Sequence, residues 1–197
     1  PLYLKQNKTL FMEIVIILGL IFLNGILSMS EIAMVSARKS RLETAAKKGS
    51  KTAKTALRLA NEPDRFLSTI QIGIALIGIL TGLYSGEALA GDLARWLETI
   101  GIPQAHSLTL AKGIIVILVT YLTLILGELV PKHLGMNAPE KIARLIARPM
   151  EVLSKIASPF VWLLSASTQA VIRLTGLHAS TENKVTEEEI KAIIQEG

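Results

Sequence analysis

The 197-residue sequence contains no cysteine, and only 5% of its residues are aromatic. The absence of cysteine excludes disulfides, zinc–thiolate sites and thiol chemistry. With so few aromatic residues and no recognition motif beside the lysines, the net charge of +5 does not indicate a nucleic-acid partner. Charged residues make up only 19% of the chain, whereas 50% of the residues are hydrophobic and the mean hydropathy is +0.47. This composition predicts a membrane protein with soluble flanks.

Three long apolar segments stand out, at residues 14–37, 66–90 and 108–130. A helix that crosses a bilayer needs about 20 predominantly apolar residues, so each segment is long enough to span. The sequence therefore predicts an all-α integral membrane fold with three transmembrane helices, in a transmembrane domain at residues 10–175. The weakly polar residues 1–9 are expected to form an N-terminal extracytoplasmic tail.

The connection between the first two spans, residues 38–65, is strongly basic. By the positive-inside rule this segment is cytoplasmic. With three spans, the N-terminus is then outside and the C-terminus is in the cytoplasm. The expected location is the inner (plasma) membrane of the cell. Its Ala- and Lys-rich composition predicts helix, with a break at Gly49-Ser50. The short segment 91–107 is expected to be an extracytoplasmic loop. The basic residues of the first connection are Arg38, Lys39, Arg41, Lys47, Lys48, Lys51, Lys54, Arg58 and Arg65.

After the third span the chain is more polar again. Residues 140–148 are basic and amphipathic and are expected to form a helix that ends at Pro149. For residues 150–175 the sequence predicts a juxtamembrane amphipathic helix. We expect this helix to be interfacial or partly re-entrant, and not a fourth span. The acidic residues 176–197 are expected to be a linker toward a further cytoplasmic domain.

One motif in the third span, Gly127-Glu128-Leu129-Val130-Pro131-Lys132, carries the clearest functional signal. An ionisable residue inside a span is costly, and Glu128 is therefore a candidate functional residue. Pro131 cannot donate a hydrogen bond to the carbonyl of Gly127, four residues before it. A free carbonyl at membrane depth needs a partner, and a cation would be one. Lys132 is interpreted either as a snorkelling charge or as a counter-ion for Glu128 when the site is empty.

The first span supplies a second polar group. Helical spacing places Asn24, Ser28 and Glu31 on one stripe, whereas Ser30 points elsewhere. Together with Gly127 and Glu128 these residues offer only oxygen ligands, which suit hard cations such as Mg²⁺, Ca²⁺ or Na⁺. The alternative is that the hydroxyls and the amide only join helices by hydrogen bonds, and that Glu31 pairs with Arg38 or Lys39.

The second span contains glycines at intervals of four or five residues. Such spacing lines one helix face and is typical of close helix packing. Ser68 and Thr69, at the start of this span, either satisfy backbone groups or line a path for the ion. The glycines are Gly73, Gly78, Gly82 and Gly86.

In these motifs the sequence resembles the CNNM/CorC magnesium-transport family. The matching segments are Asn24-Gly25 with Ser28-Met29-Ser30-Glu31, Thr69-Ile70-Gln71-Ile72-Gly73, and Gly127 to Lys132; Ile74 stands where many relatives have Asn. The resemblance implies a homodimer and a cytoplasmic CBS-domain pair that binds ATP, beyond this chain. It also implies Mg²⁺ export driven by inward Na⁺. The implied ion ligands are Asn24, Ser28 or Ser30, Gly73, Gly127 and Glu128.

The leading hypothesis is a secondary-active Mg²⁺ transporter. Glu31, Ser68, Thr69, Pro131 and Lys132 are assigned supporting or gating roles around its ion. The alternative is a membrane-anchored dimeric regulator that tethers a nucleotide sensor and moves no ions itself. An enzyme is not expected, because the spans contain no histidine and no nucleophile with a base. The residues alone do not distinguish Mg²⁺ from Na⁺ or Ca²⁺, nor the direction of transport.

Overall fold

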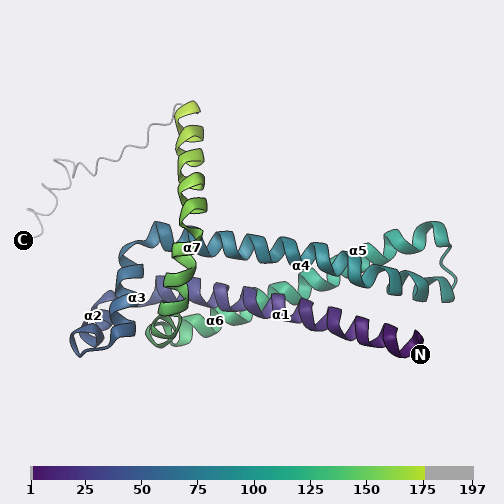
Figure 1. Cartoon of the computed structure of the whole chain (residues 1–197), viewed down its shortest axis with the longest axis horizontal. Coiled ribbons are helices and arrows are strands. Elements are labelled where there is room, and N and C mark those ends of the chain that lie inside the picture. The colour runs from purple at the N-terminus through teal and green to yellow at the C-terminus, as the bar shows by residue number, and fades with distance from the viewer. Residues whose placement is uncertain (1, 176–197) are drawn as a thin grey trace, which may run out of the picture. The chain divides into compact units, whose positions relative to one another are not determined.

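The computed structural model describes residues 2–175, and every regular element in this part of the chain is a helix (Figure 1). Three segments are long and apolar enough to cross a membrane: Leu10–Ser36, Pro63–Thr99 and Gln104–Asn137. The predicted all-α fold with three transmembrane helices is confirmed, and the dimer stays a prediction. In chain order the elements are α1 (Leu2–Ser36), α2 (Lys39–Lys47), α3 (Lys51–Asn61), α4 (Pro63–Thr99), α5 (Gln104–Leu124), η1 (Ile125–Leu129), α6 (Val130–Asn137) and α7 (Pro139–Leu174).

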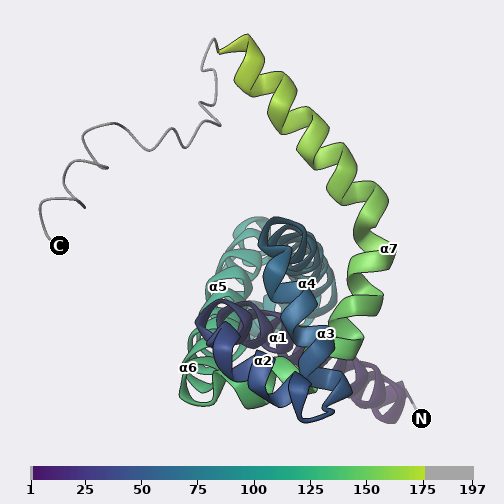
Figure 2. The ribbon, with the colours of Figure 1, turned by 90° about the vertical axis from the view of Figure 1, so that its left-hand side faces the viewer.

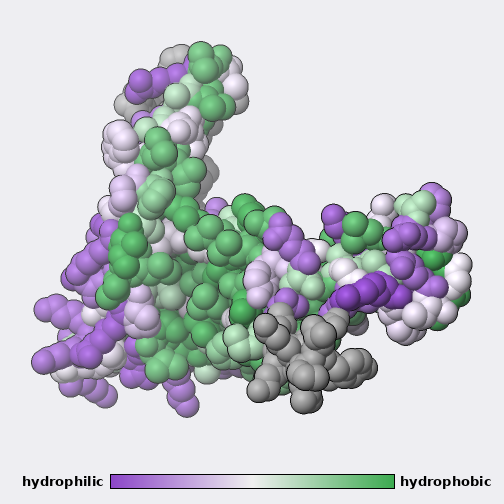
Figure 3. All heavy atoms as spheres, turned by 45° about the vertical axis from the view of Figure 1, so that its right-hand side comes forward, coloured by the Kyte–Doolittle hydropathy of each residue, from purple (hydrophilic) through white to green (hydrophobic). Residues whose placement is uncertain are grey.

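The spans expose their large apolar side chains. Phe22, Ile79 and Ile117 are 70%, 68% and 72% exposed, respectively. Leaving such a side chain in water forgoes about 1.5–3 kcal/mol, so a surface of this kind requires a lipid environment. Figure 3 shows hydrophobic residues over the spans, with hydrophilic residues gathered at the α2–α3 end and at the α4–α5 turn. The protein is therefore a multi-pass membrane protein.

The basic connection between the first two spans folds into two short helices, as predicted. The break between α2 and α3 falls at Gly49, whose positive φ of 89° is the conformation that glycine adopts most readily. Ser50 caps α3, because its side chain accepts a hydrogen bond from the backbone N–H of Ala53 at 3.3 Å. Local residue chemistry thus sets both helix ends.

The helices α2 and α3 lie across the ends of the spans (Figure 2). A hydrophobic cluster holds them there. Leu42 of α2 and Ala56 of α3 are fully buried in it, beside Phe66 and Ile70 of α4. The first part of α7 contributes Ala147 to the same cluster. The main core of the described chain therefore lies at the basic end of the spans.

The expected loop at residues 91–107 is wrong. The helix α4 continues to Thr99 and α5 begins at Gln104, which leaves a turn of four residues containing Gly101 with a φ of 99°. The physical reason is that Ala94 and Leu97 pack against Ala111 of α5. This apolar stripe carries the helix past the point where charged residues first appear.

The expected end of a helix at Pro149 is also wrong, because α7 runs without interruption from Pro139 to Leu174. A proline inside a helix costs about 3 kcal/mol. Here one buried face continues through Pro149, with Ile146 and Met150 on either side of it, and its packing outweighs that cost.

A compact unit extends to Ser158, and the rest of α7 belongs to a second unit. The helix α7 is not among the three candidate spans, in agreement with the absence of a predicted fourth span. The expected tail at residues 1–9 is helical from Leu2 onward. The acidic segment 176–197 lies outside the described residues.

Candidate cation site between the first and third spans

The third span contains a π-helical turn, η1, at the motif that the sequence singles out. In this turn the backbone N–H of Val130 donates to the carbonyl of Ile125, five residues back. Single π turns inside α-helices are rare and occur frequently at functional sites. Sequence reasoning anticipated the disturbance caused by Pro131 but not the extra residue in the turn before it.

The carbonyl of Gly127 has a partner from another helix. The side-chain amide of Asn24 donates to it, with Nδ2 3.0 Å from the carbonyl oxygen. This bond replaces the one that Pro131 cannot make. It also fixes the orientation of the Asn24 side chain, because only the amide nitrogen can donate to a carbonyl.

Glycines let α1 approach η1 and α6 closely. A Cβ at Gly25 would lie 3.0 Å from Pro131 Cγ and 3.1 Å from the Leu126 carbonyl oxygen. A Cβ at Gly135 would lie 2.7 Å from the Met29 carbonyl oxygen, a backbone atom that has no freedom to rotate away. Sequence reasoning missed both positions as packing sites, although each glycine lies on a face that also carries site residues.

Two buried oxygens on α1 lack a partner. Among the described residues, the buried side-chain atoms without a hydrogen bond are Asn24 Oδ1 and Ser28 Oγ. The two residues are one turn apart, so their side chains lie on the same side of α1. A buried polar group without a hydrogen bond costs about 1–3 kcal/mol, and a pair of them on one stripe calls for an explanation.

One lysine links the acidic residues of the two spans. Lys132 Nζ lies 2.7 Å from Glu128 Oε1 and 3.8 Å from Glu31 Oε2. Of the two interpretations of Lys132, the structure shows the ion pair with Glu128. The alternative that Glu31 pairs with Arg38 or Lys39 is not what the structure shows, because the carboxylate of Glu31 meets Lys132 of α6.

The remaining predicted site residues make their contacts elsewhere. Ser30 is buried and donates to the Ile26 carbonyl oxygen at 2.6 Å, on its own helix. Thr69 likewise donates to the Arg65 carbonyl oxygen at 2.8 Å. Ser68 is partly buried. Gly73 faces α1, where a Cβ would lie 2.7 Å from Leu27 Cδ1, so the second span meets α1 there by apolar contact.

The expected packing role of the other second-span glycines is wrong within this chain. A Cβ at Gly78, Gly82 or Gly86 would have no atom within 4 Å. These residues line open clefts between α4 and α5 instead. The glycines that lie against backbone atoms of another helix are Gly25, Gly127 and Gly135, between the first and third spans.

The site is poor in charge. Among residues 2–175, no group of three or more His, Cys, Asp or Glu side chains is placed to hold a metal ion. Its oxygens come from an amide, a hydroxyl, a backbone carbonyl and the carboxylate of Glu128. Oxygen donors of these kinds are the ligands that hard cations prefer.

Comparison with known proteins places this arrangement in context. A family model described as the Cyclin M transmembrane N-terminal domain, CNNM, matches residues 15–197. A UPF0053 protein of Synechocystis is 46% identical over 191 residues, which cover 97% of this chain and 43% of the relative. The polyamine export protein of Escherichia coli is 29% identical over 185 residues, 94% of this chain and 41% of the relative. The chain thus spans less than half the length of these relatives.

Proposed function

The chain belongs to the CNNM family of membrane proteins, and on this premise we propose that it transports a hard cation, Mg²⁺, by a secondary-active mechanism. The ion would bind between the first and third spans. Its ligands would be Asn24 Oδ1, Ser28 Oγ and the Glu128 carboxylate, with the carbonyl of Gly127 beside them.

The observation that supports this proposal most strongly is the pair of unpartnered buried oxygens on α1. A cation between the two helices would give both oxygens a partner and so recover their desolvation cost. Mg²⁺ prefers six oxygens in octahedral geometry and usually keeps several of its waters. Two neutral oxygens and one carboxylate leave room for such waters. Of the two serines, Ser28 is the better ligand, because the hydroxyl of Ser30 already donates to its own helix.

Lys132 would pair with the carboxylates of Glu128 and Glu31 when no cation is bound. Its ammonium neutralises Glu128 and approaches Glu31. An arriving cation would displace the ammonium from Glu128, so that neither state leaves the carboxylate unpaired at membrane depth. The lysine would thus lower the cost of the empty site and weaken ion binding.

The position of the residues along α1 supports entry from the basic end. Glu31 lies five residues before the end of α1 at Ser36, about 8 Å along the helix, and Asn24 about 18 Å. With the basic helices in the cytoplasm by the positive-inside rule, the ion would enter from the cytoplasm, consistent with export. We propose Na⁺ entry as the driving reaction, as the family resemblance implies.

A polyamine is the second candidate substrate. The relative from Escherichia coli carries the name polyamine export protein. In this chain a primary ammonium, that of Lys132, already lies between two carboxylates. The amino groups of a polyamine are ammonium groups of the same kind, so the pair Glu31 and Glu128 is chemically suited to one of them.

The family resemblance also supports a homodimer and a CBS-domain pair that binds ATP outside this chain. In the alternative, the membrane domain only anchors and dimerises that nucleotide sensor and carries no ions. The unpartnered oxygens favour transport over this alternative, because an anchor has no need for them.

Flux through the purified protein tests the proposal. We expect proteoliposomes loaded with a Mg²⁺-sensitive dye to show saturable Mg²⁺ movement that an opposing Na⁺ gradient accelerates. Addition of spermidine should compete if the site also accepts polyamines. Liposomes with and without the protein that show equal Mg²⁺ movement, with or without Na⁺, would favour the anchored regulator.

A further inference from the structure

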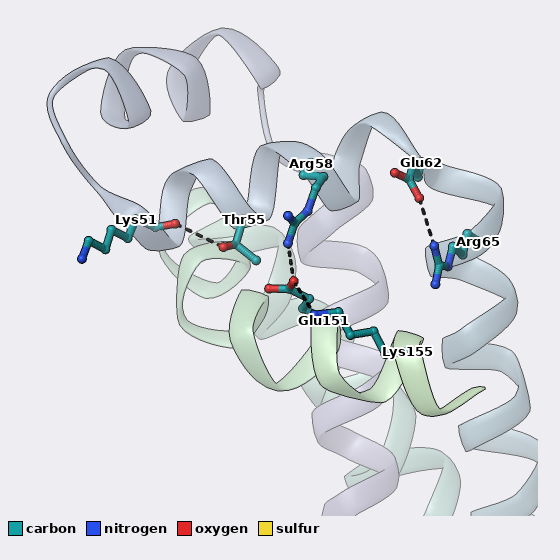
Figure 4. Close-up of polar contacts among 7 residues, drawn as sticks. All are labelled: Lys51, Thr55, Arg58, Glu62, Arg65, Glu151 and Lys155. Carbon is teal, nitrogen blue, oxygen red and sulfur yellow. Dashed lines mark hydrogen bonds and ion pairs between the residues drawn. The ribbon is translucent and has the colours of Figure 1, made fainter. Parts of the chain in front are cut away.

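A second polar site lies at the basic end of the spans, apart from the candidate cation site. It is a cavity of about 250 Å³ between α3, the first turn of α4 and the first part of α7. Figure 4 shows the ion pairs among the charged residues that line it. Leu59 and Phe66 form its apolar wall. The polar residues that line it are Arg58, Glu62, Arg65, Glu151, Ser154 and Lys155.

The charges of this cavity are nearly, but not fully, balanced. Three cationic side chains face two carboxylates, which leaves one net positive charge. Glu151 is shared, because it pairs with Arg58 and also with Lys155 at 3.2 Å, while Arg65 pairs with Glu62 at 3.6 Å. Each guanidinium has five N–H donors, so both arginines keep donors for a further acceptor.

A serine in the cavity wall supplies an unused hydroxyl. Ser154 is only 5% exposed and lines the cavity. Within residues 2–175 its side chain makes no hydrogen bond, unlike the serines that bond to their own helix. Ser154 as a residue is thus buried, and its hydroxyl is a free donor in the wall of a cavity bordered by cationic groups.

The depth of the cavity indicates what fills it. Arg65 lies in the first turn of α4, and the apolar part of that span begins at the next residue, Phe66. The cavity therefore lies at the boundary of the hydrocarbon region, where the phosphates of phospholipids are found. A single net positive charge matches the single negative charge of a phosphodiester, whereas a phosphate monoester carries nearly two at neutral pH.

From these observations we propose that the cavity binds the phosphodiester of a phospholipid headgroup, through Arg58, Arg65, Lys155 and the hydroxyl of Ser154. The bound lipid would join α3, α4 and the first part of α7 at the membrane surface. The acyl chains would extend along the apolar face of α4.

Thermal unfolding of the purified protein in detergent tests this site. The ligand is dioctanoyl phosphatidylglycerol, and the two control ligands are dioctanoylglycerol, which lacks phosphate, and glycerophosphoglycerol, which lacks acyl chains. We expect only the intact lipid to raise the unfolding temperature saturably. Equal stabilisation by dioctanoylglycerol would overturn the phosphate site, and equal stabilisation by glycerophosphoglycerol would overturn the membrane lipid as its source.

Variants of residues that line the cavity test which side chains bind the lipid. In Arg65→Gln the lipid concentration for half-maximal stabilisation should rise roughly tenfold, as expected for a lost charged hydrogen bond. In Ser154→Ala, which keeps every charge, it should rise several-fold. Lys54→Gln removes the same charge from the exposed face of α3, outside the cavity, and should leave this concentration unchanged. Identical values for the wild type, Arg65→Gln and Ser154→Ala would refute the proposal.

Discussion

The hydroxyl of Ser28 and the amide oxygen of Asn24 lie one turn apart on the same side of α1, but they differ in the hydrogen bonds that their side chains make. Asn24 uses its nitrogen to hold the Gly127 carbonyl and so places its oxygen beside the third span. Ser28 makes no hydrogen bond at all. Its burial without a partner is thus a net cost to stability, and under the proposed function a bound cation would offset that cost.

Replacing Ser28 therefore separates stability from ion binding. Without Mg²⁺, Ser28→Ala should be more stable than the wild type by about 1 kcal/mol, because a buried group without a partner is removed. Addition of Mg²⁺ should raise its unfolding temperature less than that of the wild type. Thermal unfolding with and without MgCl₂ measures both effects.

Ser30→Ala is the matched control, since it removes a buried hydroxyl that does have a partner. It should not gain stability, and it should keep the response to Mg²⁺. A Ser28→Ala variant that is destabilised and still responds fully to Mg²⁺ would contradict the role assigned to this oxygen.

At the scale of elements, the decisive contact is the close crossing of α1 with η1 and α6. Gly25, Gly127 and Gly135 remove side chains at the points where the backbones meet. The π turn of the third span contains Gly127 and Glu128, and Gly127 lies against α1. The proposed ligand set thus depends on two backbones being held close together.

Substitution of a glycine at this crossing should be costly. In Gly135→Ala the added methyl group would lie 2.7 Å from the Met29 carbonyl oxygen, and we expect a loss of about 1–3 kcal/mol. Gly82→Ala, whose methyl group would meet no atom within 4 Å, should be neutral or slightly stabilising. Unfolding in detergent of the two variants side by side tests this difference, and equal stability would show that the crossing is not tight.

Sequence alone predicted the elements whose causes are local. The three spans follow from runs of apolar residues, and the break at Gly49-Ser50 follows from glycine and a capping serine. Features that depend on a distant partner were not predictable. Examples are the continuation of α7 through Pro149, which needs the buried face beneath it, and the pairing of Glu31 with Lys132 across two helices.

The candidate site also has features that the sequence predicts and features that only the structure shows. The stripe of Asn24 and Ser28 and the effect of Pro131 follow from helix geometry, and the structure does bring Asn24 to Gly127. Which glycines allow the approach was not evident, because glycine spacing is the same whether a face packs or stays open. Gly78 and Gly82 fit the pattern of a packing face but line a cleft.

For the described part of the molecule as a whole, positive charge is concentrated at one end of the spans. The basic helices α2 and α3 and the first part of α7 are joined there by a hydrophobic cluster and by ion pairs. Glu151 is central to these pairs. A hydrogen bond from Lys155, with the nearby charge of Arg58, lowers the pKa of Glu151 below its ordinary value.

This shift predicts a dependence of stability on pH. Because the folded-state pKa is lowered, the stabilisation is present above about pH 4.3, the value for an unfolded chain, and is lost as the pH falls through the lowered pKa. Glu151→Gln should therefore unfold at a lower temperature than the wild type at neutral pH, and the difference should shrink in acid. Glu43→Gln, on the exposed face of α2, is the control and should match the wild type throughout.

The most direct test of the central claim, that Glu128 binds the transported ion, is Mg²⁺ flux in proteoliposomes containing Glu128→Gln. This variant keeps the shape of the side chain and removes its charge. The account predicts that flux is abolished, whereas Glu87→Gln, which removes a carboxylate from the cleft between α4 and α5, keeps wild-type flux. Wild-type flux in a folded Glu128→Gln protein would contradict the account.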